Sequence, residues 1–233
     1  MEKILGIIGG MGPEATVDLM QRIIRLTPAL DDGDHIHCLV DSNPKIPSRI
    51  KAIIEGQGED PGPVIAEMAR GLEASGADFL VIACNTAHFY YKTVCEAVTI
   101  PVIHMVEAAL EHIRENRPNC SELGILASPA IGITGLYEKI FGPEGIRIIY
   151  PDPDEQEILF RVIRSIKAGD HSPLVQEQYD RVCGHLKKKG VGLAVVACTE
   201  LSTLNRATCL ATLDAAEILA KRVVDVVKGV KPI

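Results

Sequence analysis

The chain has 233 residues, of which 47% are hydrophobic and 24% are charged, and its formal net charge is −7. This composition is typical of a soluble globular protein with one large or two small domains. The sequence contains neither an apolar run long enough to span a bilayer nor a basic stripe, so we expect no membrane and no nucleic acid as partner.

The seven cysteines are an odd number, widely spaced, and contain no Cys-x-x-Cys pair. This spacing argues against a disulfide framework and against a zinc site. The first residues, Met1-Glu2-Lys3, lack the layout of a secretory signal and lead directly into a strand-like run. We therefore expect a reducing, cytoplasmic compartment and no bound metal.

Apolar runs typical of buried strands alternate with amphipathic stretches typical of helices in the first part of the chain. We predict strands at 4–8, 36–40, within 76–84 and at 101–104, and helices at 14–26, 60–75, up to 97 and at 105–115. The turn Gly9-Gly10-Met11-Gly12-Pro13 joins the first strand to its helix, with Pro13 at the first helical position. A second turn, 41–49, follows the second strand.

The order of elements restarts near residue 123, where Leu123-Gly124-Ile125-Leu126 repeats the pattern of Leu5-Gly6-Ile7-Ile8. We predict further strands at 123–126, 146–150 and within 190–198, and helices at 154–168, 172–189 and 214–228. Strands that alternate with helices indicate parallel sheets covered by helices. We assign 1–101 plus 211–233 to one α/β domain and 102–210 to a second, similar one.

Residues 76–84 and 190–198 share one pattern: a glycine, a short apolar run, and then Ala-Cys. Cys84 and Cys198 therefore fall at the carboxyl ends of buried strands, where α/β sheets place their ligand sites. A lone free cysteine is usually a small buried hydrophobe. Two cysteines in equivalent positions favour a single reaction that is carried out from two sides.

The glycine turn has a competing interpretation, because residues 10–15 fit the dinucleotide fingerprint G-x-G-x-x-A after a strand. Asp41, at the end of the second strand, would then be the residue that binds the ribose. This hypothesis leaves the cysteine pair unexplained, and the same backbone amides can hold any carboxylate. A simple tight turn is the third alternative.

Two cations and one histidine are further candidates. Arg49 and Lys167 lie in or beside loops, where they are either solvated charges or a site for an acidic substrate, since arginine grips carboxylates with two hydrogen bonds. His88 lies four residues after Cys84. It is either a base for that thiol or a residue with only a structural role.

Several of these motifs together resemble the aspartate/glutamate racemase family, within which the cofactor-independent aspartate racemases are most similar. The resemblance covers nearly the whole chain, from Ile4 to the tail helix. Its most specific motifs are Cys84-Asn85-Thr86-Ala87-His88 and Ala197-Cys198-Thr199-Glu200. The supporting motifs are Gly9-Gly10-Met11-Gly12-Pro13, Ser42-Asn43-Pro44 with Pro47 and Arg49, Gly58-Glu59-Asp60-Pro61 and Lys167-Ala168-Gly169.

The resemblance implies two parallel-sheet α/β domains related by pseudo-twofold symmetry, with the active site in the cleft between them, in a homodimer. It implies that Cys84 and Cys198 are the acid/base pair, with Cys198 taking the proton from the L form and Cys84 from the D form. Arg49 and Lys167 would hold the side-chain carboxylate of the substrate. The other expected substrate-binding residues are Met11, Ser48, Asn85, Thr86, Ala87, Thr199 and Glu200.

We therefore predict an aspartate racemase that works on a small acidic amino acid without any cofactor. One departure is the segment 127–132, which replaces the Thr/Gly-rich turn of the relatives and keeps one hydroxyl, on Ser128. It leaves a glutamate racemase or a broader acidic amino-acid racemase as alternatives. A Rossmann-like oxidoreductase and an inactive amino-acid-binding module are the alternatives from other classes.

Overall fold

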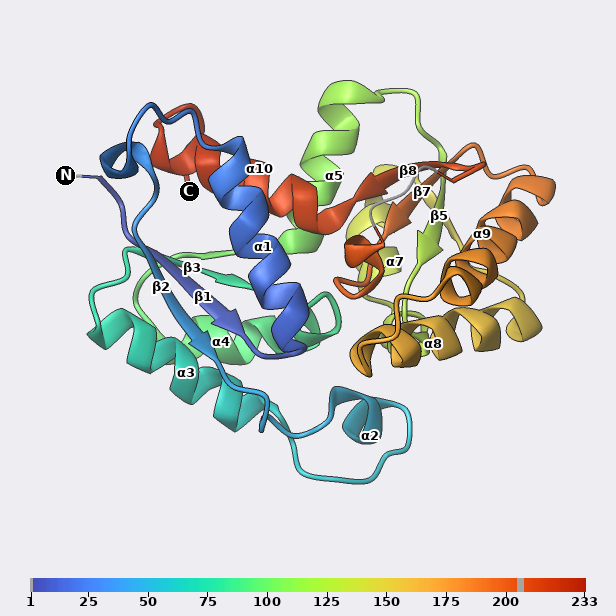
Figure 1. Ribbon diagram of the computed structural model, residues 1–233, viewed down its shortest axis with the longest axis horizontal. Helices are drawn as coiled ribbons and strands as arrows, with labels where there is room; N and C mark the ends of the chain where they lie inside the picture. Colours follow the sequence, from blue (N-terminus) through green and yellow to red (C-terminus); the bar gives the residue numbers. More distant parts are fainter. Residues whose placement is uncertain (1, 205–207) are drawn as a thin grey trace.

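The strands form two four-stranded sheets in the computed structural model, which describes residues 2–204 and 208–233 (Figure 1). Every strand pair is parallel, and the orders β2-β1-β3-β4 and β6-β5-β7-β8 are equivalent. The strands are β1 (Leu5–Gly9), β2 (Cys38–Ser42), β3 (Phe79–Ile82), β4 (Val102–Ile103), β5 (Glu122–Leu126), β6 (Arg147–Ile149), β7 (Leu193–Val196) and β8 (Ala211–Asp214). The predicted α/β fold with two similar parallel sheets is thus confirmed.

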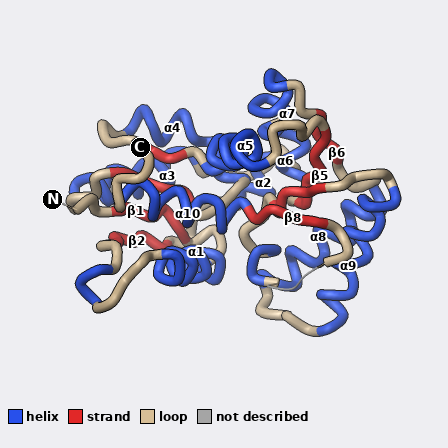
Figure 2. The backbone as a smooth tube through the Cα atoms, turned by 90° about the horizontal axis from the view of Figure 1, so that it is seen from above, coloured by secondary structure: helices blue, strands red, loops and turns tan. Residues whose placement is uncertain are grey.

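Helices flank both sheets. The α-helices of the described residues are α1 (Pro13–Leu26), α2 (Arg49–Ile53), α3 (Gly62–Ala74), α4 (Tyr91–Ala97), α5 (Met105–Asn116), α6 (Pro129–Thr134), α7 (Leu136–Phe141), α8 (Pro153–Lys167), α9 (Pro173–Lys188) and α10 (Ala215–Val227). Short 3-10 helices are η1 (Asp32–Asp34), η2 (Thr86–Tyr90), η3 (Gly142–Glu144) and η4 (Leu201–Thr203). Seen from above, α10 leads from β8 of the second sheet back over the first (Figure 2). No helix in this described part of the chain is long and apolar enough to cross a membrane.

Alternation along the strands divides the apolar side chains into three cores, because successive side chains of a strand point to opposite faces. In β1, Ile7 points into a central core and Ile8 into a core beneath α3. The central core contains Ile125 and Val195 of the second sheet as well, together with the apolar faces of α1, α5 and α10. Each such buried aliphatic side chain stabilises the fold by about 1.5–3 kcal/mol. Shared burial therefore holds the two sheets against each other.

The two Ala-Cys pairs are oriented in the same way in their sheets, with alanine on the face of the central core and cysteine on the outer face. Cys84 packs with Ile82 on the side of α3, whereas Ala83 belongs to the central core. Cys198 packs with residues of α8 and α9, whereas Ala197 belongs to the central core. The repeat in the sequence thus corresponds to equivalent positions in the two halves.

Several boundaries differ from the sequence interpretation. Strand β2 begins two residues later than predicted, and a 3-10 helix, η2, precedes α4 after Cys84. Helices α2, α6 and α7 occupy segments in which no helix was expected. They have only five or six residues each, too few to show a helical repeat of apolar residues. Local signals start two of them: the Ser48 hydroxyl accepts a hydrogen bond from Lys51 N at 3.3 Å, and Pro129 opens α6.

The strand pairings also correct the assignment of two short segments to the halves. Residues 102–103, which we placed with the second domain, pair with β3 in the first sheet. Residues 211–214, which we placed with the first domain, form β8 beside β7 in the second sheet. Strands this short carry no pattern of their own, so the free edge of the neighbouring strand decides where they go. The remainder of the domain division stays a proposal.

Candidate active site

Cys84 and Cys198 lie at equivalent strand ends and are buried, with 6% and 7% of their surface exposed. Ala83 N donates to Ile8 O at 2.9 Å, and Ala197 N donates to Leu126 O at 2.8 Å. The backbone ladder of each sheet therefore extends to the alanine, and each cysteine comes directly after it. All seven cysteines are free thiols.

Lys167, the last residue of α8, lies close to both thiols. Burial lowers its pKa, but the Glu200 carboxylate beside it and, more weakly, negative charge at Cys84 and Cys198 raise the pKa above its usual value overall. One cation thus interacts with the ends of β3 and β7, which belong to different sheets. The two strand ends that the sequence singled out therefore lie near the same lysine.

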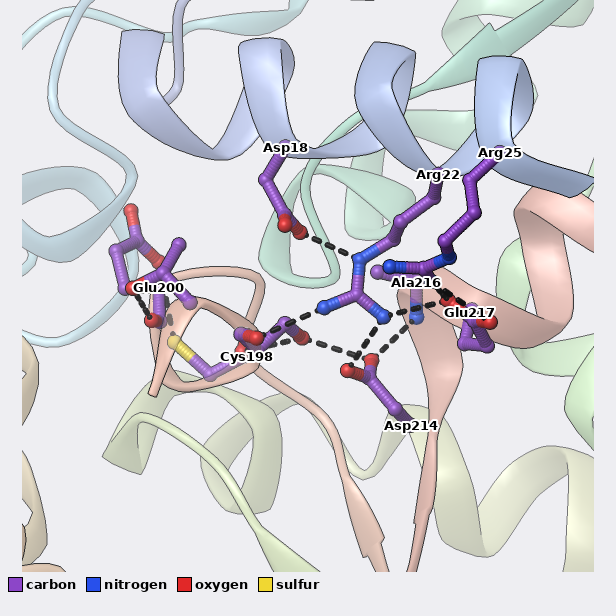
Figure 3. A network of polar contacts seen from close by, with 10 residues as sticks. Asp18, Arg22, Arg25, Cys198, Glu200, Asp214, Ala216 and Glu217 are labelled. Atoms are coloured by element: carbon purple, nitrogen blue, oxygen red, sulfur yellow. Dashed lines mark hydrogen bonds and ion pairs between the residues drawn. The ribbon is translucent and has the colours of Figure 1, made fainter. Parts of the chain in front are cut away.

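Glu200 connects the thiol of the second half to the glycine turn of the first. Its Oε1 accepts a hydrogen bond from Gly12 N at 3.2 Å and another from Lys167 Nζ. Its Oε2 accepts one from the Cys198 thiol at 3.1 Å (Figure 3). Only 5% of Glu200 is exposed. Burial and the neighbouring carboxylate raise the pKa of Cys198 well above its usual value, so Cys198 rests as a protonated thiol. We expected Glu200 to contact the substrate; in this structure both of its oxygens bind groups of the protein.

Asn85 and Thr199 follow the two cysteines and are buried. Tyr137 donates its hydroxyl to Asn85 Oδ1 at 2.8 Å and thereby orients the amide. Asn85 Nδ2 and Thr199 Oγ1 are buried and have no hydrogen-bond partner within the described residues. A buried polar group without a partner costs about 1–3 kcal/mol, so both atoms are suited to binding a ligand. Tyr137 was missed in the sequence, because it lies in the second half and no local motif connects it to Asn85.

The two halves also meet through hydroxyl groups, since Thr86 Oγ1 lies 3.3 Å from Ser128 Oγ. Ser128 precedes α6 in the segment that departs from the family pattern, and its side chain is buried beside the site. Met11 and Ala87, which we expected to bind substrate, are buried in the core beneath α3. Ser48 caps α2. In this structure Met11 and Ala87 therefore pack in the core and Ser48 caps a helix, whereas the two hydroxyl groups meet beside the site.

The glycine turn is held by hydrogen bonds within the protein. Gly10 has a φ of +87°, and a Cβ there would lie 2.3 Å from the backbone of Asn43. Gly10 N donates to Thr16 Oγ1 at 2.9 Å, and Thr16 Oγ1 donates to Gly12 O at 3.1 Å. Since Gly12 N is used by Glu200, the amides of Gly10 and Gly12 are both occupied. This arrangement does not favour the dinucleotide interpretation, which needs such amides for a pyrophosphate.

Arg49 begins α2, and its Nη1 donates to the carbonyls of Ile46 at 3.3 Å and Pro47 at 3.0 Å. Burial and the Asp60 charge raise the pKa of Tyr90, and the Arg49 charge opposes that rise. Arg49 therefore lies near η2, on the side of Cys84. Arg49 thus binds carbonyls of its own loop and Lys167 binds Glu200, and the convergence of these two cations on one carboxylate remains a prediction.

His88 is a structural residue in this site. Met105 N donates to His88 Nε2 at 3.1 Å, so Nδ1 carries the proton and donates to Cys84 O at 2.9 Å. Burial lowers the pKa of His88 to about 4, so the ring is neutral at pH 7. Both ring nitrogens bind backbone groups, and the hypothesis that His88 is the base for Cys84 is wrong. The ring instead holds the Cys84 carbonyl against the start of α5.

We expect the protein to lose stability in acid through His88 and its neighbour His104. Burial lowers the pKa of His104 to about 3, and its Nδ1 caps α5 by accepting from Val106 N at 3.2 Å and Glu107 N at 3.3 Å. Both histidines have folded pKa values below the unfolded value of about 6.5, so the unfolded state binds more protons as the pH falls. The stabilisation is complete above about pH 6.5 and is lost towards pH 4.

Urea unfolding at pH 6.5 and 4.5 tests this expectation. Each pKa unit corresponds to about 1.4 kcal/mol, so each histidine contributes up to about 2.7 kcal/mol to the loss. His104→Asn keeps a side-chain cap that does not titrate, and it should reduce the loss by about 2 kcal/mol. His37, which is exposed, is the control, and His37→Asn should lose as much as the unmodified protein. An unchanged loss in His104→Asn would contradict the assignment.

Within residues 2–204 and 208–233, no group of three or more His, Cys, Asp or Glu side chains is arranged to hold a metal ion. The independence from metals and cofactors remains a prediction.

Comparison with known proteins finds relatives that cover most of the chain. Residues 8–228 match the model of the family described as Asp/Glu/Hydantoin racemase. The "Broad specificity amino-acid racemase RacX" of Bacillus subtilis (strain 168) is 28% identical over 209 residues, which are 86% of this chain and 87% of RacX.

Solved structures include the aspartate racemase of Picrophilus torridus, with a TM-score of 0.86 and 27% identity over 97% of this chain and 94% of that one. The glutamate racemase isoform RacE1 of Bacillus anthracis has a TM-score of 0.68 at 18% identity, over 97% of this chain and 82% of that one, and so shares the fold. The chain therefore belongs to the Asp/Glu/Hydantoin racemase family and is an isomerase of the racemase type.

Proposed function

We propose that this protein interconverts L- and D-aspartate by proton transfer between two cysteines, without a cofactor. One observation carries the proposal. Two buried thiols occupy equivalent strand ends near one lysine, and each is followed by a buried polar atom that has no partner in the described residues. Inversion at Cα needs one group that removes a proton and another that delivers a proton to the opposite face, and two equivalent thiols from two halves suit this requirement.

The protonation of the pair follows from the contacts of Cys198. Its raised pKa keeps the thiol protonated, ready to deliver a proton when Cys84, as thiolate, takes one from the D form. For the L form the roles reverse, and Cys198 has to lose its proton first. Glu200 Oε2, at 3.1 Å, is placed to accept that proton, with Lys167 balancing the carboxylate charge. In each direction of the reaction, one thiol therefore has to deliver a proton while the other, as thiolate, removes one.

The unpaired donors beside the thiols support stabilisation of the carbanion. Asn85 Nδ2 and Thr199 Oγ1 would bind the α-carboxylate, on which negative charge grows as the Cα proton leaves. Fixed donors in a buried site stabilise such charge without reorganising. Tyr137, which holds the Asn85 amide, contributes by keeping that donor in place.

Arg49 and Lys167 support an acidic side chain as the preferred substrate, and the aspartate racemase of Picrophilus torridus supports aspartate. Lys167 is already paired with Glu200, which leaves Arg49 as the cation on the Cys84 side for the second carboxylate. The broad specificity named for RacX keeps a wider range of amino acids as the alternative. The homodimer and the cytoplasmic location expected from the sequence remain predictions.

A chiral assay tests the function. The purified protein, dialysed against a chelator and free of pyridoxal phosphate and nucleotide, should convert L-aspartate and D-aspartate into the racemate. Glutamate should react more slowly, and alanine, which lacks the second carboxylate, much more slowly. No conversion of any of the three amino acids would refute the proposal, and activity that returns only with an added cofactor would refute its cofactor independence. Equal turnover of alanine and aspartate would favour the broad-specificity alternative.

Arg49→Lys should reduce the kcat/KM for aspartate at least tenfold, or about 1.4 kcal/mol in transition-state stabilisation. Lysine keeps the charge but lacks the planar fork that binds a carboxylate with two hydrogen bonds. Alanine turnover is the internal control and should change less than twofold. Lys45, exposed in the same loop, offers a matched variant, and Lys45→Ala should leave aspartate kinetics unchanged. Equal losses with aspartate and alanine in Arg49→Lys would contradict a carboxylate-binding role.

A further inference from the structure

A buried arginine ties the first half of the molecule to the segment that carries Cys198. Arg22 lies in α1 and is only 8% exposed. Its Nε donates to Asp18 Oδ2 at 2.6 Å within the same helix. Its Nη1 lies 3.0 Å from Asp214 Oδ2 and 2.8 Å from Glu217 Oε2, and its Nη2 donates to Ser202 O at 2.8 Å (Figure 3). The guanidinium thus reaches η4, the end of β8 and the start of α10.

The Ser202 contact leads directly to the cysteine. Ser202 N donates to Cys198 O at 3.2 Å, and Ser202 Oγ lies 3.4 Å from the same carbonyl and 2.8 Å from Asp214 Oδ1. Ser202 therefore accepts a hydrogen bond from Arg22 with its carbonyl oxygen and donates one to the Cys198 carbonyl with its amide. Movement of Ser202 relative to α1 would move Cys198 as well.

The other end of α1 meets the same segment. Gly12 N, at the start of α1, donates to Glu200 Oε1 at 3.2 Å, and Glu200 in turn accepts from the Cys198 thiol. Gly12 and Arg22 are ten residues apart, or about 15 Å along a helix. Two attachments at that spacing define both the distance and the orientation of the 198–202 segment relative to α1.

Helix α1 is also fixed relative to the other thiol. It follows β1, whose residue Ile8 pairs with Ile82 and accepts the amide of Ala83 at 2.9 Å, one residue before Cys84. The path from Cys84 through β1 and α1 to Cys198 therefore consists of backbone ladder, helix and the Arg22 contacts. The side-chain contacts of Arg22 are a link in this path that a single substitution can weaken without changing a residue that contacts the Cys198 thiol.

We propose that Arg22 is a positioning residue that sets the separation of the Cys84 and Cys198 thiols across the site. The inference rests on the proposed two-thiol racemisation. In that reaction the D form loses its Cα proton to the Cys84 thiolate, and Cα takes a proton from the Cys198 thiol on the opposite face. If Cys198 is displaced, the carbanion regains a proton from Cys84, so the α-hydrogen exchanges with solvent while the configuration is retained.

Arg22→Lys in D₂O tests the proposal, with Arg25→Lys as the matched control. Arg25 is one turn further along α1, its side chain is 60% exposed, and it contacts the same Glu217. In Arg22→Lys we expect racemisation of D-aspartate to fall at least tenfold while α-deuterium uptake falls much less. The ratio of exchange to inversion should therefore rise at least fivefold. Arg25→Lys should keep both rates within twofold of the unmodified protein.

Three results would overturn the proposal: racemisation within twofold of normal in Arg22→Lys, equal losses of exchange and inversion, or the same ratio change in Arg25→Lys. Equal losses would indicate a merely structural role, because partial unfolding removes active molecules and reduces both rates together. If Arg22→Lys does not fold by circular dichroism, Asp18→Asn removes the carboxylate charge that orients the Arg22 guanidinium and leaves Ser202 unchanged. It should raise the exchange-to-inversion ratio at least twofold, and an unchanged ratio would overturn the proposal. Failure of the proposed function is distinguishable, because the unmodified protein would then neither exchange nor invert aspartate.

Discussion

Replacing either Cys84 or Cys198 by alanine is expected to abolish racemisation while leaving the fold intact. A positioned acid or base usually contributes 10²–10⁴-fold to a rate, and inversion needs both groups, so each single variant should lose at least a thousandfold. Each thiol packs in an outer core just beyond the end of its strand, and replacing one thiol group by hydrogen changes packing only locally. Chiral analysis of aspartate, together with circular dichroism of each variant, measures the effect.

Deuterium exchange separates the roles of the two thiols. In D₂O, Cys198→Ala should still exchange the α-hydrogen of D-aspartate through Cys84, whereas Cys84→Ala should exchange only that of L-aspartate. Cys120→Ala is the control, since Cys120 is a partly buried free thiol that precedes β5, and it should keep full activity. Racemisation at the normal rate in either active-site variant would refute the two-base mechanism.

Lys167→Ala is expected to reduce racemisation at least a hundredfold, or about 2.7 kcal/mol in transition-state stabilisation. Removing the ammonium leaves Glu200, which is 5% exposed, without its cation partner. Breaking a buried ion pair by removing one partner is strongly unfavourable, because the remaining charge is uncompensated. The Lys167 charge also lowers the pKa of Cys198, so without it this thiol would lose its proton less readily. Conversion of L-aspartate, for which Cys198 has to be deprotonated, should be affected most.

A double-mutant cycle tests whether Lys167 and Glu200 act as one unit. The double variant Lys167→Ala, Glu200→Gln should be no slower than Lys167→Ala alone, because effects of coupled groups are not additive. Lys189→Ala is the matched control, since Lys189 forms a surface ion pair with Asp152 beyond the end of α9, and its kinetics should be normal. Losses that multiply in the double variant, or a loss below tenfold in Lys167→Ala, would refute the coupling.

The architecture was readable from local patterns because both halves repeat them. Buried parallel strands are short apolar runs, so β1, β3, β5 and β7 were visible in the sequence. The short helices and the edge strands β4 and β8 were missed or misassigned, because they depend on the element beside them rather than on their own residues. Sheet edges and helix ends of this kind are decided only when the chain has folded.

The sequence by itself determined most of the candidate residues of the site. The repeated Ala-Cys steps identified Cys84 and Cys198, and parallel strands bring such carboxyl ends to one edge of each sheet. Asn85, Thr199, Lys167 and Glu200 followed from the resemblance of their motifs to those of the racemase family. Periodicity and strand polarity are properties of a short segment, so they can be read without knowing the rest of the fold.

Only the tertiary structure decided what these residues do to one another. The Cys198 thiol donates to Glu200, and the Glu200 carboxylate also binds Gly12 and Lys167. Both nitrogens of the His88 ring are hydrogen-bonded, one to Cys84 O and the other to Met105 N. Gly12 and Glu200 are 188 positions apart. Hydrogen bonding and pKa depend on which groups meet in the buried interior, and no local pattern encodes a partner at that separation.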